Sequence, residues 1–531
     1  MRSWVFALAG ASLWVVLAAS TLVAGPIQKS SNPSPAARDH LARAQQALEA
    51  RDFRQARAHL KLALQADPNS AAAYLMLGLV EFQSGDTAQA IQDYQRALNL
   101  QPDSFSGHYN LALAYLRGRN LQEGLRELER AISLDPRHAD AAYNRGLVLL
   151  DLGRPEEALA SLRRARARGP ERPDVAFNLL RAELAAHRVD EARREAEHAA
   201  KNFGADPDWR AAIGRLFLEQ GQPRDAVVHL AEALRLRPDG QETSRLLATA
   251  YLQSNDPAAA LAQIPSPTTA EDHYLRASAL YLLRQAPEAE QESRRALELA
   301  PGEPSYLLLR ARIGQRLGRH AEALELLRQA SQRAPQRPEP YYSAGVSYYL
   351  LRRYEETRRS LARALELDPR SARALFLYAA SLVNEGKNRE GEEYLQRALA
   401  LEPANARFHY HLGALLLRDN RPAEAQQAFE KAIRLKPDFA PPHYQLGKLL
   451  VRSNHPQLAA RELETAIQHQ PDLAQAYYQL SRAYALLGET EKSARALAAF
   501  NNLKQQEIEE SQEFMEDVKR QLEVPLPQPA R

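Results

Sequence analysis

The sequence predicts an all-α fold, a solenoid of about fourteen helix-turn-helix repeats, because three columns of residues recur every 34 positions. The first column is proline, the second is alanine and the third is a small residue. Examples of the three columns are Pro68, Pro102 and Pro136; Ala63, Ala97 and Ala131; and Gly78, Ala112 and Gly146. One helix pair is too small to bury a core, but stacked pairs bury a continuous one.

The N-terminal residues predict export. Residues 4–25 carry no charge and follow Arg2, a minimal basic region, and Ala18-Ala19-Ser20 resembles a signal-peptidase cleavage site. The run is also long enough to span a bilayer. We therefore expect 1–25 to be a signal peptide or an N-terminal membrane anchor, followed by a Pro- and Ser-rich flexible linker at 26–36. The rest of the chain would be periplasmic or secreted, or anchored to the inner membrane.

Residues 71–104 show how one unit is built. Apolar residues at helical spacing predict a first helix that Gly85 ends, since glycine enters the left-handed cap cheaply. Asp86 is placed to cap the second helix, and Pro102 prevents that helix from continuing. Gly78 lies inside the first helix, where glycine costs about 1 kcal/mol relative to alanine. We attribute it to a close crossing of the two helices.

The repeats divide into two halves. Residues 37–269 form units one to seven, and 270–507 form units eight to fourteen. Unit five has Leu180 in the small-residue column. Unit seven is short, so we expect a truncated second helix and a hinge or change of curvature near 253–270. Residues 489–522 predict a long final helix, with 508–531 as a polar capping helix and a disordered tail.

The period, the small first-helix residue, the alanines and the closing proline resemble the tetratricopeptide repeat, a family in which units of this kind form a right-handed superhelix. The resemblance covers nearly all of the chain after the linker. It implies that first helices line a concave groove. It also implies a role in protein–protein interaction, with a protein or peptide as the partner.

A column of aromatic–asparagine pairs supplies the first candidate binding residues: Tyr109, Asn110, Tyr143, Asn144, Phe177 and Asn178. By the resemblance they face the groove, where an amide can both donate to and accept from a peptide backbone. The alternative is that the pair belongs to the repeat's consensus, with the ring packed between units and the amide solvated. The aromatic residue persists later as Tyr342, Tyr410, Tyr444 and Tyr478, which could also stack on sugar rings.

Other function classes find little support in the sequence. The 69 Lys and Arg against 66 Asp and Glu give no sign of nucleic-acid binding, and the absence of cysteine excludes thiolate metal sites. We find no catalytic-triad motif, no phosphate loop and no HExxH. His409 and His411, two apart on one helix, fall on different faces. Charged runs such as 192–201 are interpreted as solvated helix faces with i,i+4 pairs. We predict no enzyme activity, no cofactor and no metal.

The sequence thus predicts a non-catalytic scaffold of the bacterial envelope that holds an extended peptide or partner helix. One alternative is a repeat subunit of a polysaccharide-export, pilus or other envelope machine. Glycan binding and the repeat arm of a glycosyltransferase-type enzyme are further alternatives. Membrane contact is expected only through 4–25, if that segment is retained.

Overall fold

The structure, a computed structural model, describes residues 34–169 and 171–522, with side chains through Gln506. The predicted signal or anchor at 1–25, most of the predicted linker and the last nine residues of the predicted tail lie outside this range. The first described helix begins at Pro35, so the final two residues of the predicted linker are helical. Within the described residues, no helix combines the length and apolar character needed to cross a membrane.

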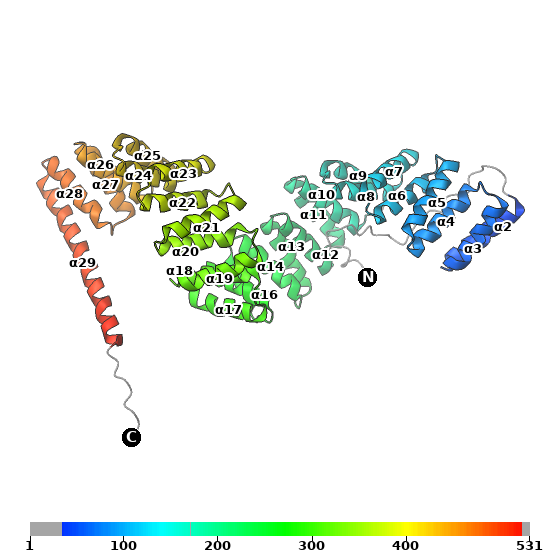
Figure 1. Ribbon diagram of the computed structural model, residues 1–531, viewed down its shortest axis with the longest axis horizontal. Helices are drawn as coiled ribbons and strands as arrows, with labels where there is room; N and C mark the ends of the chain where they lie inside the picture. The colour runs from blue at the N-terminus through cyan, green and yellow to red at the C-terminus, as the bar shows by residue number, and fades with distance from the viewer. Residues whose placement is uncertain (1–33, 170, 523–531) are drawn as a thin grey trace, which may run out of the picture. The chain divides into compact units, whose positions relative to one another are not determined.

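The described chain is a succession of helices that pair as neighbours, as Figure 1 shows. Fourteen pairs follow one another, α2–α3 to α28–α29, and no strand occurs among the described residues. This confirms the predicted all-α repeat fold. The described chain divides into two compact units, the first ending at 268 and including 278–283, the second comprising 269–277 and beginning again at 284.

The first seven pairs all fall in the first unit. Their helices are α2 Pro35–Glu49, α3 Phe53–Ala66, α4 Ala71–Ser84, α5 Thr87–Leu100, α6 Phe105–Arg117, α7 Leu121–Leu134, α8 Ala139–Asp151, α9 Pro155–Arg168, α10 Pro173–Ala185, α11 Val189–Phe203, α12 Pro207–Glu219, α13 Pro223–Leu236, α14 Gln241–Gln253 and α15 Pro257–Ala262.

The later pairs begin with α16, which is divided between the units, and continue within the second unit. Their helices are α16 Ala270–Leu282, α17 Ala286–Leu299, α18 Pro304–Arg316, α19 His320–Arg333, α20 Pro338–Leu350, α21 Tyr354–Leu367, α22 Ala372–Asn384, α23 Asn388–Leu401, α24 Ala406–Arg418, α25 Pro422–Leu435, α26 Ala440–Arg452, α27 Pro456–His469, α28 Ala474–Leu486 and α29 Thr490–Leu522. The last helix agrees with the long helix predicted at 489–522.

The α4–α5 pair forms as its sequence predicts. Gly85 ends α4 with φ +94°, a conformation that disfavours a side chain, and the Asp86 carboxylate accepts from the Gln89 amide at 3.0 Å. A Cβ added to Gly78 would lie 2.6 Å from ring atoms of Tyr94 on α5. The glycine column therefore lets the second helix insert a large side chain against the first, as predicted.

Unit five exchanges the sizes of the two contacting residues. Leu180 replaces the small residue on α10, and Ala196 stands on α11 where Leu162 and Leu230 stand in the neighbouring units. Leu180 and Ala196 are both fully buried in one core cluster. The large side chain has moved from one helix of the pair to the other, so the space between the helices stays filled.

Unit seven has the shortened second helix that its sequence predicts. Helix α15 contains six residues, whereas the other second helices of the first unit contain fourteen or fifteen. The hinge expected near 253–270 stays a prediction.

Candidate interaction surfaces

The aromatic–asparagine column is buried in the described structure. Tyr109, Tyr143 and Phe177 each retain less than a tenth of their exposure, and so do the adjacent asparagines. The amide of Asn144 donates to the Tyr109 hydroxyl at 3.0 Å, and the amide of Asn178 donates to the Tyr143 hydroxyl at 3.1 Å. Each amide therefore joins its own repeat to the preceding one.

The two hydrogen bonds Asn144–Tyr109 and Asn178–Tyr143 are called the ladder below, and the sequence explains why it has only these two members. For Asn110 to form the equivalent bond, a hydroxyl would have to stand 35 residues earlier, but that residue is Leu75. The Oδ1 atom of Asn110 is buried without a partner. Phe177 offers no hydroxyl, and the next position for an amide is Ala212. The ring does pack between units, as the consensus alternative holds, but the amide is buried rather than solvated. Whether any of these residues binds a ligand stays a prediction.

Charged groups surround the ladder. Arg172 bridges Asp140 and Asp174, each at 2.6 Å, and its guanidinium lies 5.1 Å from the centre of the Tyr143 ring. Burial is the main reason that the pKa values of Tyr109 and Tyr143 are well above the ordinary tyrosine value. Burial thus extends the pH range over which both hydroxyls stay protonated.

The later tyrosines differ in exposure. Tyr342, Tyr410 and Tyr444 are half-buried, and Tyr478 is 43% exposed. Tyr410 packs edge-on against Phe439, and Tyr478 lies 5.4 Å from Phe500 between ring centres. The second unit therefore keeps part of its aromatic column accessible, whereas the first unit buries it.

His108 and His443 form hydrogen bonds to the backbone of the turns that connect one repeat to the next. His108 and His443 each donate from Nε2 to the carbonyl of the proline six residues earlier, at 2.8 and 2.9 Å. Their Nδ1 atoms lie 2.6 Å from Glu127 and Glu462 on the second helix of the same pair. His409 is buried and His411 is exposed, which confirms that they occupy different faces.

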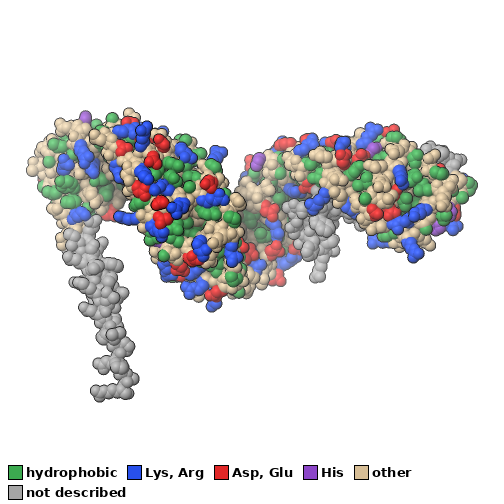
Figure 2. All heavy atoms as spheres, in the orientation of Figure 1, with side chains coloured by type: hydrophobic (Ala, Val, Ile, Leu, Met, Phe, Trp, Pro, Cys, Tyr) green, Lys and Arg blue, Asp and Glu red, His purple; other side chains and the backbone are tan. Residues whose placement is uncertain are grey.

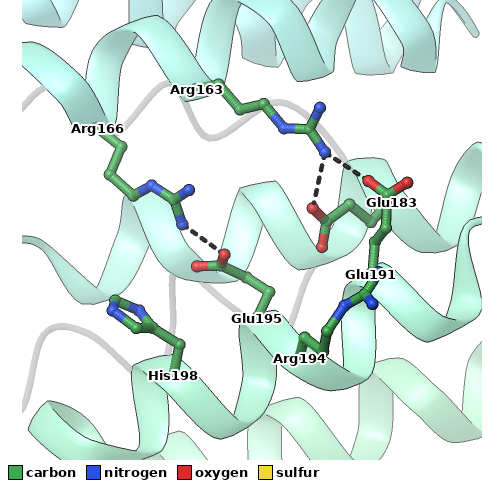
Figure 3. A pocket seen from close by; sticks show the side chains of 7 residues that line it. All are labelled: Arg163, Arg166, Glu183, Glu191, Arg194, Glu195 and His198. Carbon is green, nitrogen blue, oxygen red and sulfur yellow. Dashed lines mark hydrogen bonds and ion pairs between the residues drawn. The ribbon is translucent and has the colours of Figure 1, made fainter.

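A polar pocket of about 600 Å³ lies among α9, α10 and α11 (Figure 3). It is lined by Arg163, Arg166, Glu183, Glu191, Arg194, Glu195 and His198. Arg163 contacts Glu191 at 2.6 Å and Glu183 at 3.3 Å, and Arg166 pairs with Glu195. Run 192–201 is solvated in part, as interpreted, because Arg193, Arg194, Glu197, His198 and Lys201 are exposed. Glu195 is buried, however, and the ion pairs of the run join different helices, Glu195 with Arg166 and Arg193 with Asp225, in place of the expected i,i+4 pairs.

Glu183 is the unusual member of this pocket. It is 3% exposed, and its Oε2 has no partner among the described residues. Burial, then the charge of Glu195, raises the pKa of Glu183 to about 7, although Arg163 acts in the opposite direction. Three arginines and three glutamates line the pocket, together with His198. In the part of the chain that the structure describes, no three acidic, His or Cys side chains are grouped to hold a metal ion.

Solved structures of similar arrangement were found by comparison. The crystal structure of the APC/C hetero-tetramer Cut9–Hcn1 is 17% identical, covers 85% of this chain and 96% of its own, and gives a TM-score of 0.42. The crystal structure of yeast Tom70 is 17% identical, and the match covers 86% of this chain and 99% of the Tom70 chain with a TM-score of 0.35. The crystal structure of MamA protein is 20% identical, and the match covers 36% of this chain and 97% of the MamA chain with a TM-score of 0.29. No curated protein sequence matches the chain.

Family models match along most of the sequence. One described as a TPR repeat matches 78–117, and one described as a tetratricopeptide repeat matches 109–173, 274–338, 379–438 and 444–501. A further tetratricopeptide repeat model matches 149–216 and 217–264. Together the matches cover more than two thirds of the 531 residues, and the chain therefore belongs to the tetratricopeptide repeat family.

Proposed function

We propose that this protein is a non-catalytic scaffold of the bacterial envelope that binds an extended segment or a helix of a partner protein on the first helices of its second unit. Repeats of this family generally mediate protein–protein interaction and are typically non-enzymatic. The location is proposed from the uncharged N-terminal run at 4–25.

One observation carries the choice of surface. The first unit buries its aromatic column and commits two of its three asparagine amides to neighbouring repeats. In the second unit Tyr342, Tyr410 and Tyr444 are half-buried and Tyr478 is exposed. Aromatic side chains that keep accessible area are the residues that protein interfaces favour as anchors.

The test is site-specific photocrosslinking in cells. A photoreactive amino acid would replace Tyr478 on α28, and a matched variant would carry it at Leu299, an exposed position on the second helix α17. We expect one defined protein adduct from position 478 and none from position 299. The same adducts from both positions, or none from 478, would contradict the proposed surface.

The proposed location needs its own measurement. A reporter enzyme that folds only outside the cytoplasm would be fused after residue 36, and we expect it to be active. An inactive reporter with a normally expressed fusion would argue against export, whatever the crosslinking shows.

A further inference from the structure

The first helices of the last four repeats carry cations and no carboxylates. Helices α22, α24, α26 and α28 contain no Asp or Glu in their sequences. They carry six Lys and Arg residues, here called the basic face: Arg373, Arg407, Arg418, Lys448, Arg452 and Arg482. The paired second helices α23, α25 and α27 carry the carboxylates of these repeats instead.

The cations of the basic face have no carboxylate partner among the described residues. Most arginines elsewhere in the described chain form ion pairs, such as Arg421 with Glu392 and Glu424. Arg482 donates only to a neutral side chain, that of Gln479 at 3.4 Å. Figure 2 shows Lys and Arg interspersed with Asp and Glu over the visible surface. Five members of the basic face are exposed, and Lys448 is half-buried. The side chains are therefore available to an outside partner.

Helix stability does not account for this arrangement. Arg418 and Arg452 stand in the last turn of their helices, where the helix dipole favours a cation. Arg373 and Arg407, in contrast, are the second residues of α22 and α24, where the dipole disfavours one. Lys448 and Arg482 lie within their helices without a carboxylate three or four residues away.

Tyrosines alternate with these cations. Tyr410 follows Arg407 by three residues, Tyr444 precedes Lys448 by four and Tyr478 precedes Arg482 by four, so each tyrosine lies one turn from a cation on the same helix face. A cation also lies near a tyrosine of the preceding repeat, because the charge of Arg373 on α22 lowers the pKa of Tyr342 on α20, although burial acts more strongly and raises it.

We propose that the basic face binds an acidic segment of a partner protein, in which apolar side chains contact the tyrosines while Asp and Glu pair with the arginines and lysine of that face. This rests on the proposed scaffold function and names the chemistry of the partner. A nucleic acid fits less well, because it carries charge at every phosphate. The second helices α23, α25 and α27 carry both cations and carboxylates, so they would offer such a uniform polyanion no net attraction where it overlaps them.

The experiment measures fluorescence polarisation with the full chain and three labelled probes. The acidic probe repeats Glu-Leu-Asp-Phe four times, the neutral probe repeats Gln-Leu-Asn-Phe four times, and the third is a sixteen-nucleotide oligo-dT. We expect the acidic probe to bind at least about tenfold more tightly than the neutral one, and more weakly as salt is raised. We also expect it to bind more tightly than oligo-dT.

Two charge-matched triple variants decide where binding occurs. Arg407→Gln, Lys448→Gln and Arg482→Gln remove one cation from each of α24, α26 and α28. Arg359→Gln, Lys431→Gln and Arg461→Gln remove three exposed cations from the second helices α21, α25 and α27. We expect at least about tenfold weaker binding in the first variant and less than about twofold change in the second. The melting temperature of the first variant should not fall, since its three cations have no ion pairs to lose.

Each contrary result has a distinct meaning. No binding of the acidic probe, equal binding of the neutral probe or equal loss in both variants would overturn the acidic-partner proposal. Tighter binding of oligo-dT would overturn it in favour of a nucleic acid. A crosslinked partner at position 478 combined with any of these results would leave the scaffold function standing without the acidic chemistry.

Discussion

A single amide–hydroxyl contact gives the aromatic–asparagine pair its structural role. Asn178 donates both to the Tyr143 hydroxyl of the preceding repeat and to the Asp174 carbonyl of its own helix. A hydrogen bond of this kind contributes on the order of 1 kcal/mol net, and burying a lone amide costs more than that. The pair can therefore be retained in consecutive repeats without any ligand.

This gives a prediction for the ladder. Tyr143→Phe and Asn178→Ala should each destabilise α8 and α10 by about 1 kcal/mol, and the double variant should cost less than the sum because both remove the same bond. Amide hydrogen exchange of the two helices would measure the local free energies of opening. Strictly additive effects would show that the ring and the amide act independently.

A second residue-scale prediction concerns two histidines at equivalent repeat positions. His443 and His409 both donate to a proline carbonyl, but Glu462 faces His443 where the other repeat has Ala428. Burial lowers the pKa of each imidazole. For His443 the Glu462 hydrogen bond, the proline carbonyl and the Glu462 charge together outweigh it, so its pKa is raised, whereas that of His409 is lowered.

The opposite pKa shifts of His443 and His409 give opposite pH dependences of stability. The stability contributed by charged His443 should be complete below about pH 6.5 and lost as the pH rises through its folded-state pKa, whereas the contribution of His409 should be lost as the pH falls below about 6.5. NMR titration of the two imidazoles would order their pKa values. Glu462→Gln should bring the pKa of His443 below 6.5, and an unchanged value would refute the assignment to Glu462.

At the scale of the helix, the repeat could be predicted from sequence because its strongest signals are local. Gly85, Asp86 and Pro102 act within one turn of their own position. The ladder and the polar pocket could not be predicted in this way. Their partners lie up to 35 residues apart in sequence, as for Tyr109 with Asn144 or Arg166 with Glu195, and depend on how one pair packs on the next.

Two helical glycines of the second unit should respond oppositely to the same substitution. A Cβ on Gly345 in α20 would lie 2.7 Å from Leu361 Cδ2, whereas the nearest atoms to a Cβ on Gly314 in α18 are 3.8 Å away. Gly345→Ala should therefore destabilise its pair by about 1–3 kcal/mol through overpacking. Gly314→Ala should stabilise its helix by about 0.5–1 kcal/mol through propensity alone.

Hydrogen exchange of α18 and α20 would measure both effects within one array. In a Leu361→Ala background, which is itself destabilised by a cavity, Gly345→Ala should add little or no further cost, because the atoms that the new methyl group meets are gone. A stabilising Gly345→Ala would mean that the helix crossing is looser than the structure describes, and that the glycine column reflects something other than close packing.

At the scale of the whole molecule, the weakest repeat limits how far folding cooperativity extends along the array. In a repeat protein each unit is stabilised by its own core and by its interfaces with neighbours, so a weak unit divides the array into blocks. The six-residue α15 is the shortest described helix, and the chain separates near it into two compact units. A helix this short can bury less area than its fourteen-residue counterparts, which makes unit seven the place where cooperativity is expected to break.

This predicts two unfolding transitions in urea. Trp209 is buried in the first unit and is the one tryptophan among the described residues, while circular dichroism reports helices of both units. With Trp4 and Trp14 replaced by Phe, tryptophan fluorescence should report a single transition, that of the first unit. Circular dichroism should resolve two transitions, one of which has the same midpoint as the fluorescence transition. Destabilising the second unit with Gly345→Ala should shift only the second circular-dichroism transition, which fluorescence does not report. Coincident curves that both shift with Gly345→Ala would instead mean that coupling passes through unit seven and that the fourteen repeats unfold as one cooperative array.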